Sequence, residues 1–197
     1  HSDEKIKQEA LDFVSLLTPV VKSLFTDLAM EITSDAMQIH GGYGFTQDQG
    51  IEQLYRDNRI TPIYEGTNSV QAADLVFRKL VNKNGDIITK YLDLIKKESD
   101  LDGDEMKPFI NDLNYQIKIL EEFTTWIKDK IQSSKDDASA ACNDYLKALG
   151  YVAAAHAWVK VLEVSFKEYN SNKNFYEEKI QTANFYFKRV LPRAESH

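Results

Sequence analysis

The chain has 197 residues, of which 43% are hydrophobic and 28% are charged, and its formal net charge is −7. A chain of this length buries about 70% of the surface of its unfolded state, so it can form its own hydrophobic core. The excess of 31 acidic over 24 basic side chains argues against nucleic acid as a partner. No run of about 20 consecutive apolar residues is present, so no transmembrane segment is predicted.

The cysteine content bears on the cellular compartment, and the first residues bear on whether the chain is a fragment. Cys142 is the single cysteine and cannot form an intrachain disulfide, which favours a reducing compartment, either the cytoplasm of a bacterium or a space like the mitochondrial matrix. The chain begins with His1 and Ser2 rather than methionine, directly before a predicted helix. We therefore expect it to be a fragment of a longer protein.

The spacing of apolar residues predicts an all-α fold. Only 8 glycines and 4 prolines are present, and they lie between long stretches in which apolar residues recur every three or four positions. Thr18-Pro19 is typical of an N-cap followed by proline at the first helical position. The pattern thus predicts one helix over residues 4–16 and a second from Pro19 to His40.

Apolar residues form one stripe along this second helix. Further helices are predicted after it. The stripe consists of Val20, Leu24, Leu28, Ile32, Ala36 and Ile39. A short helix is predicted near 51–59, and another is capped by Thr67 or Asn68 and turns Val70 inward.

Long helices dominate the second half of the sequence. After a helix that follows Gly85, the periodicity predicts helices over about 105–133, 138–169 and 174–190. Such lengths favour an antiparallel helical bundle. We divide the chain into a first domain, 1–83, and a helical extension, 84–197.

Three segments depart from ordinary helical sequence: QIHGGYGF from Gln38, LYRDNRI from Leu54 and IYEGTN from Ile63. The glycines of the first segment let the backbone approach a ligand and offer N–H groups to an anionic oxygen. The same glycines also suit a helix C-cap followed by a tight turn. Residue chemistry leaves both interpretations open.

Glu65 is the most unusual residue of the third segment, since it lies between Tyr64 and Gly66 in an apolar, non-helical stretch. Apolar surroundings raise the pKa of a carboxyl group, as a general base working near neutral pH requires. Alternatively, Glu65 only stabilises the dipole of the helix that begins at Thr67. These two interpretations also remain open.

In their order and spacing, the three segments resemble the C-terminal helical domain of acyl-CoA dehydrogenases, flavoenzymes that oxidise acyl-CoA thioesters to 2-enoyl-CoA. The resemblance implies that Glu65 is the catalytic base and that Tyr64 and Gly66 contact the substrate. It implies FAD as cofactor and an electron-transferring flavoprotein as electron acceptor. The residues that it places at the FAD are Gln38, Ile39, His40, Gly41, Gly42, Thr67, Asn68 and Ser69.

The resemblance also has implications for assembly and completeness. The segment from Gln38 to Gly42 matches the part that reaches the FAD of a neighbouring subunit, which implies a homo-oligomer, either a dimer or a tetramer. The stretch TNSVQAADLVFRKL is similar to larger bacterial members of the family, which carry a helical extension. The family's flavin-cradling domains precede the matched region, so we expect the isolated chain to be inactive. The alternative is a non-catalytic helical binding or scaffold module derived from the family.

The remaining polar residues receive structural interpretations. We expect Arg56 and Asp57 to form an ion pair, with a direct substrate contact as the alternative. His40 is expected to bond locally, His156 to be a core histidine, and Cys142 to act as a small hydrophobic residue. No spacing typical of a metal site is present.

Overall fold

The computed structural model describes residues 3–81 and 86–196. Within these ranges the prediction of an all-α fold is confirmed, and no described residue lies in a strand. The predicted domain boundary between residues 83 and 84, and the glycine expected to precede the next helix, lie outside the described residues. The helices are α1 (Glu4–Ile39), α2 (Ile51–Asn58), α3 (Asn68–Asp74), α4 (Asp86–Glu98), α5 (Lys107–Ser133), α6 (Lys135–Lys167) and α7 (Lys173–Phe185).

Shorter helical turns connect or extend these helices. Two 3₁₀ turns, Gly41–Phe45 and Gln47–Gln49, join α1 to α2, and a third, Tyr169–Ser171, joins α6 to α7. α3 and α7 each continue into a π turn, at Leu75–Lys79 and Tyr186–Val190, and a final 3₁₀ segment spans Leu191–Ser196.

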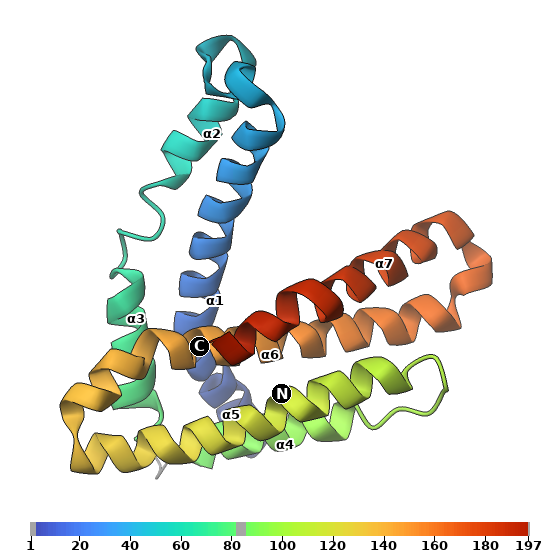
Figure 1. The fold of residues 1–197 in the computed structure, drawn as a ribbon. Coiled ribbons are helices and arrows are strands. Elements are labelled where there is room, and N and C mark those ends of the chain that lie inside the picture. Colours follow the sequence, from blue (N-terminus) through green and yellow to red (C-terminus); the bar gives the residue numbers. More distant parts are fainter. Residues whose placement is uncertain (1–2, 82–85, 197) are drawn as a thin grey trace.

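The helices form a bundle from which an arm projects (Figure 1). α5 and α6 run antiparallel, and α7 returns along α6. α1 crosses these helices steeply, and its C-terminal half projects away from them together with α2. We call residues 28–63 the arm. α3 lies at the base of the arm, where it packs against both α1 and α6.

α1 is one helix of 36 residues, so the predicted break at Thr18-Pro19 is wrong. Thr18 does not cap a new helix, because its Oγ1 donates a hydrogen bond back to the carbonyl of Val14 at 2.6 Å. Proline inside a helix costs about 3 kcal/mol, whereas each large apolar side chain that becomes buried contributes about 1.5–3 kcal/mol. Three such residues on this face are almost fully buried: Leu16, Val20 and Leu24. Their burial outweighs the lost hydrogen bond.

One hydrophobic core extends from α1 through α3 into the long helices. Tyr145 of α6 is fully buried, and its hydroxyl lies 2.9 Å from Thr124 Oγ1 of α5. Burial raises the pKa of this hydroxyl well above its usual range. Other large side chains that are fully buried include Leu16, Leu75, Ile88, Ile95, Leu113, Ile117, Leu120, Ile127 and Leu149.

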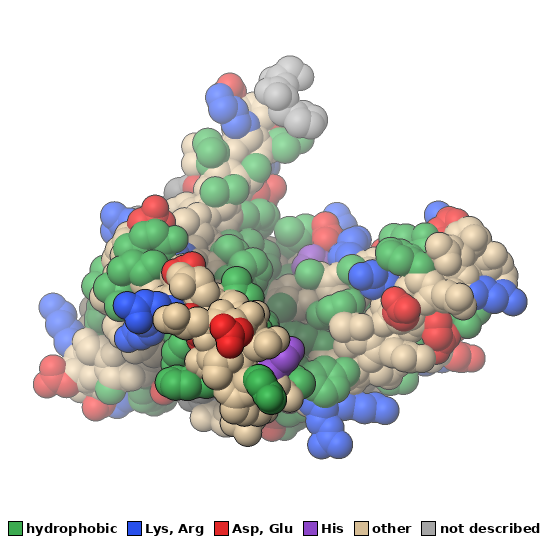
Figure 2. All heavy atoms as spheres, turned by 90° about the horizontal axis from the view of Figure 1, so that it is seen from above, with side chains coloured by type: hydrophobic (Ala, Val, Ile, Leu, Met, Phe, Trp, Pro, Cys, Tyr) green, Lys and Arg blue, Asp and Glu red, His purple; other side chains and the backbone are tan. Residues whose placement is uncertain are grey.

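The outer part of the arm carries apolar side chains that the described chain does not cover. The stripe predicted on α1 is buried at Val20 and Leu24, yet Ile32 and Ile39 are 64% and 83% exposed. Val70 of α3 is 57% exposed, so its predicted inward position is wrong. Figure 2, which is seen from above, shows hydrophobic side chains at the surface of this end of the molecule.

By length and composition, α1 is the one described helix that could cross a membrane. A core helix of a soluble protein meets the same criterion, and 28% of the most apolar window of α1 is buried. The face that carries Leu16, Val20 and Leu24 packs within the core of this chain.

Candidate functional site

The segment from Gln38 to Gly42 forms the tip of the arm (Figure 1). α1 ends at Ile39, and Gly41 adopts a left-handed φ of 59° that favours glycine. A Cβ at Gly41 or Gly42 would have no neighbour within 4 Å. The backbone of these two glycines is therefore open to an approaching group. His40 bonds locally, as expected, with its Nδ1 2.9 Å from the carbonyl oxygen of Ala36.

Glu65 has an unusual backbone conformation. It is the one described residue other than glycine with a positive φ, at 55°, and Gly66 follows with a φ of 83°. The left-handed conformation costs a residue with a Cβ roughly 1–2 kcal/mol. Such backbone strain is concentrated at functional sites, where the surrounding structure holds it.

Two hydrogen bonds close the turn that carries Glu65. The backbone N–H of Asn68 donates to the carbonyl of Pro62 at 3.2 Å, and Gln71 Nε2 donates to the carbonyl of Glu65 at 2.8 Å. The backbone N–H of Glu65 itself has no acceptor within the described residues. This N–H is therefore free to bind a carbonyl oxygen.

The side chain of Glu65 is exposed, so the described chain does not supply the desolvation that the sequence predicts. Its apolar neighbours in sequence, Ile63 and Tyr64, are themselves 46% and 49% exposed. These side chains therefore cannot cover the carboxylate. Any apolar cover for Glu65 must come from a ligand or from another chain segment.

Lys22 of α1 anchors the same turn, a role that sequence reasoning missed. Its Nζ donates to the carbonyl of Gly66 at 2.8 Å and to Asn68 Oδ1 at 2.7 Å. Between residues 13 and 30, Lys22 and Asp27 are the only charged side chains. Two charges in an otherwise uncharged stretch of helix are the sequence signal that could have identified this role.

The three residues after Gly66 use their side chains within the chain. Thr67 caps α3, since its Oγ1 accepts a hydrogen bond from the N–H of Val70 at 3.3 Å. Asn68 bonds to α1, where its Nδ2 donates to Asp27 Oδ1 at 2.7 Å. Ser69 Oγ accepts from Asn143 Nδ2 of α6 at 3.3 Å. The amide of Asn68 thus ties the start of α3 to α1.

The predicted ion pair between Arg56 and Asp57 is not formed. Asp57 instead accepts a hydrogen bond from Gln53 Nε2, one helical turn earlier, at 2.6 Å. Adjacent residues on a helix point to different sides, whereas residues four apart are neighbours. Arg56 is left without a carboxylate partner among the described residues.

Cys142 is buried, in agreement with its predicted role as a small hydrophobic residue. Its Sγ donates to the carbonyl of Ala138 at 3.1 Å, and burial raises the pKa of the thiol to about 11. A thiol that stays protonated at neutral pH is a poor nucleophile. Within 3–81 and 86–196, no three His, Cys, Asp or Glu side chains are grouped so as to hold a metal ion.

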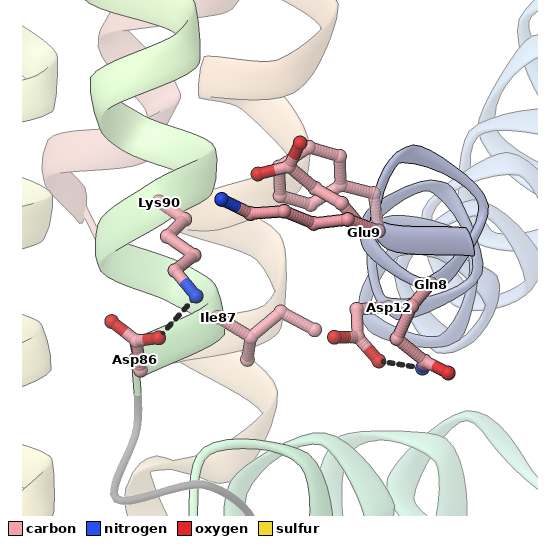
Figure 3. A pocket seen from close by; sticks show the side chains of 8 residues that line it. Gln8, Glu9, Asp12, Asp86, Ile87 and Lys90 are labelled. Carbon is pink, nitrogen blue, oxygen red and sulfur yellow. Dashed lines mark hydrogen bonds and ion pairs between the residues drawn. The ribbon is translucent and has the colours of Figure 1, made fainter. Parts of the chain in front are cut away.

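A hollow of about 300 Å³ lies between the start of α1 and the start of α4 (Figure 3). Lys90 points to Asp86, with Nζ 2.5 Å from the carboxylate, and this contact raises the pKa of Lys90. Gln8 Nε2 donates to Asp12 Oδ1 at 2.9 Å. Asp86 thus balances the charge of Lys90, and none of the predicted site residues lines the hollow.

His156 lies on α6, outside the candidate site, and its Nε2 is 3.1 Å from Glu98 Oε2 at the end of α4. Burial lowers the pKa of His156 below 6.5, while Glu98 partly opposes this shift and Lys160 adds to it. Since the folded state favours the neutral ring, the stability that His156 contributes is present above pH 6.5 and is lost as the pH falls below this value.

We therefore expect a ring titration followed by NMR to give a pKa below 6.5 for His156. The substitution Glu98→Gln should lower this pKa further, because it removes the carboxylate that favours the protonated ring. Glu163→Gln, which changes a carboxylate beside Lys160 instead, is the matched control and should have a smaller effect. A pKa at or above 6.5 would contradict the expectation.

Comparisons with known proteins agree with the resemblance in the sequence. The family model described as "Acyl-CoA dehydrogenase, C-terminal domain" matches residues 4–80, and "Acetyl-CoA dehydrogenase C-terminal like" matches residues 86–197. The 3-methylmercaptopropionyl-CoA dehydrogenase of Ruegeria pomeroyi is 42% identical over 95 residues, which cover 48% of this chain and 16% of that protein. A butyryl-CoA dehydrogenase of Syntrophomonas wolfei is 29% identical over 202 residues, which cover 96% of this chain and 32% of that protein.

A solved structure supports the fold. An acyl-CoA dehydrogenase from Bacillus anthracis, complexed with FAD, superposes with a TM-score of 0.71 at 19% identity. The superposition covers 92% of this chain and 31% of that structure. The chain thus spans about a third of the length of the Bacillus protein and of the butyryl-CoA dehydrogenase.

Proposed function

The chain belongs to the acyl-CoA dehydrogenase family, and on this premise we propose that it is the C-terminal portion of an FAD-dependent enzyme that oxidises an acyl-CoA thioester to 2-enoyl-CoA, with Glu65 as general base. The observation that carries the proposal is the conformation of Glu65. A strained, left-handed glutamate is held between α1 and α3 while its carboxylate stays open to an incoming substrate.

Two groups of Glu65 would act on the thioester in different ways. The carboxylate of Glu65 removes the α-proton, and the free N–H of Glu65 donates to the thioester carbonyl oxygen. This hydrogen bond strengthens as negative charge grows on the oxygen. Tyr64 lines the pocket for the acyl chain, and Gly66, which has no side chain, leaves room for the thioester. FAD, when bound, would supply the acceptor for the hydride that leaves the β-carbon.

The residues present fit an FAD contact at two places. At the tip of the arm, the open backbone of Gly41 and Gly42 offers N–H groups to a cofactor, next to Gln38, Ile39 and His40. At the base of the arm, Thr67 and Ser69 are exposed; each hydroxyl accepts a hydrogen bond within the chain and can still donate its own proton to a cofactor. Asn68 fits less well, because its amide is already bonded to α1.

The two places also suggest how the enzyme assembles. The tip projects away from the rest of the chain (Figure 1), so it can reach the cofactor of a second copy. A site completed in this way requires a homo-oligomer. Electrons would then pass to an electron-transferring flavoprotein. The single, buried Cys142 suits a reducing compartment such as the cytoplasm or the mitochondrial matrix.

The proposal predicts that the 197-residue chain by itself is inactive. The purified chain should show no stoichiometric flavin absorption and no dehydrogenation of acyl-CoA, because it carries only part of the contacts to FAD. A form extended by the upstream coding sequence of its own gene should retain flavin and lose its absorption when acyl-CoA is added without oxygen. Stoichiometric flavin on the short chain would contradict the first expectation. An extended form that binds no flavin would favour the scaffold alternative.

A further inference from the structure

The C-terminal segment, Leu191–Ser196, lies between the long helices and the arm, and none of the roles proposed above uses it. It packs against α6 and α5, where its residues Leu191 and Ala194 are buried. Gln116 Nε2 of α5 donates to Glu195 Oε1 of the segment at 2.6 Å. In Figure 1 the segment lies where α6 and α1 cross. It is thus fixed to the bundle beside the base of the arm.

One side chain of this segment reaches the arm. Arg193 Nη1 lies 2.7 Å from Oε1 and 2.9 Å from Oε2 of Glu31, a residue of α1 that is 162 positions earlier in the sequence. Hydrogen bonds to Glu31 and to the side chain of Tyr151 on α6 raise the pKa of Arg193. The guanidinium group therefore links α6 of the bundle to the arm.

Glu31 lies at the point where α1 leaves the bundle. Leu24, two turns earlier, is buried, and Leu28, one turn earlier, still packs against the core. Ile32 and Ile39, which follow Glu31, are exposed. The outer part of the arm is built from α1, α2 and the first 3₁₀ turn, which contact one another. A contact at Glu31 therefore acts on the arm at its base.

A contact at the base of the arm has a large effect at its tip. Ile39 is about two helical turns beyond Glu31, or roughly 12 Å along a helix that rises about 1.5 Å per residue. Over this length, a tilt of roughly 10° at Glu31 would move the tip by about 2 Å. Such a shift breaks a hydrogen bond to a ligand, because donor and acceptor must lie within about 3.2 Å of each other. An exposed ion pair adds little stability, but at this place it can fix a direction.

We propose that Arg193 is a positioning residue, which holds Glu31 and so fixes the direction in which the arm leaves the bundle. The tip, with Gly41 and Gly42, would then be held where it can contact FAD. Arg193 thus gives the C-terminal extension a part in cofactor binding without touching the cofactor, a consequence that rests on the proposed function. Both side chains of the ion pair are 43% exposed, so the contact weakens as the salt concentration rises.

The test measures the position of the arm in the 197-residue chain without flavin. Spin labels at two exposed positions, Asp48→Cys on the arm and Asn170→Cys beyond the end of α6, report the distance between the arm and the bundle. Cys142 is buried and its thiol has a pKa of about 11, so it reacts slowly with the label at neutral pH. Arg193→Gln should shift the mean distance by about 2 Å or more, or broaden its distribution. Arg189→Gln, which removes an exposed charge nearby, is the matched control and should leave the distribution unchanged.

A charge swap separates positioning from stability alone. Arg193→Glu places two carboxylates together and should displace the arm at least as much as Arg193→Gln. The double substitution Glu31→Arg/Arg193→Glu should restore the original distribution. An unchanged distribution in Arg193→Gln, with or without a lower Tm, overturns the proposal. A displacement that the swap does not reverse also overturns it, because the ion pair would then not be the cause.

The consequence for the cofactor is measured in the extended protein. Arg193→Gln should weaken the retention of FAD about two- to fivefold, the factor that an exposed ion pair supplies, and the charge swap should restore it. Because the labels are read without flavin, a failure of the proposed function leaves that measurement intact. A displaced arm with unchanged FAD retention supports the positioning role of Arg193 and counts against the FAD contact at the tip instead.

Discussion

Replacement of Glu65 by glutamine should slow the reduction of bound flavin by acyl-CoA roughly 10²–10⁴-fold, the range that general acid–base catalysis contributes. The measurement is the anaerobic loss of flavin absorption in a form of the protein long enough to bind FAD. Glutamine has nearly the same shape as glutamate but cannot accept the α-proton. The contacts that hold the turn use the backbone of Glu65 and Gly66, so they survive the substitution.

Two controls make this result specific to the base. The Glu65→Gln protein should still bind FAD, since the carboxylate is not needed to hold the cofactor. Glu178→Gln makes the same chemical change at an exposed position of α7 and should leave the rate unchanged. Undiminished flavin reduction in Glu65→Gln would show that another group removes the proton.

The sequence was a good guide to the helices that are buried along one face. α5 is the clearest case, because Leu113, Ile117, Leu120 and Ile127 follow helical spacing and are all buried. Periodicity reports which residues share a face, but it does not report whether another element covers that face. Ile32 and Ile39 continue the stripe of Val20 and Leu24, yet they lie on the arm and are exposed.

Local signals were less reliable where tertiary packing opposed them. Thr18-Pro19 has the composition of a helix start, but α1 continues through it because its neighbouring residues are buried in the core. Arg56 and Asp57 are adjacent in sequence with opposite charges, but a helix turns them apart. Such outcomes depend on contacts between segments distant in sequence or on helix geometry, which composition alone does not encode.

The motifs of the sequence located the candidate site, but they did not predict the contacts that hold it in place. The sequence singled out Glu65 and Asn68, and in the structure one lysine of α1, more than 40 residues earlier, bonds to Asn68 and to the carbonyl of Gly66, the residue after Glu65. Lys22 and Asp27 lie on either side of the amide of Asn68, which accepts from the first and donates to the second. This arrangement suggests that Asn68 acts mainly by positioning the turn that carries Glu65, rather than by contacting FAD.

That interpretation predicts that Asn68→Ala destabilises the chain even without flavin. The substitution removes the Asn68 oxygen that accepts a hydrogen bond from Lys22 and the Asn68 N–H that donates one to Asp27. Hydrogen bonds to charged groups contribute about 1.5–3 kcal/mol each. Because the site is only partly buried and water can replace some of these contacts, we expect a loss of about 2 kcal/mol in the free energy of unfolding. For a chain of this length, such a loss lowers Tm by about 4–8 °C, which thermal denaturation followed by circular dichroism would detect.

The nearby amide of Asn143 provides the matched control. Among the described residues its side chain makes one hydrogen bond, to Ser69 Oγ at 3.3 Å, and this partner is uncharged, so Asn143→Ala should cost about 1 kcal/mol or less. If Asn68 served only as a cofactor contact, Asn68→Ala would leave the Tm of the flavin-free chain unchanged and would weaken only the retention of FAD by the extended protein. If it positions the turn, the flavin-free chain loses stability, and flavin reduction in the extended protein slows because Glu65 is no longer held in its left-handed conformation.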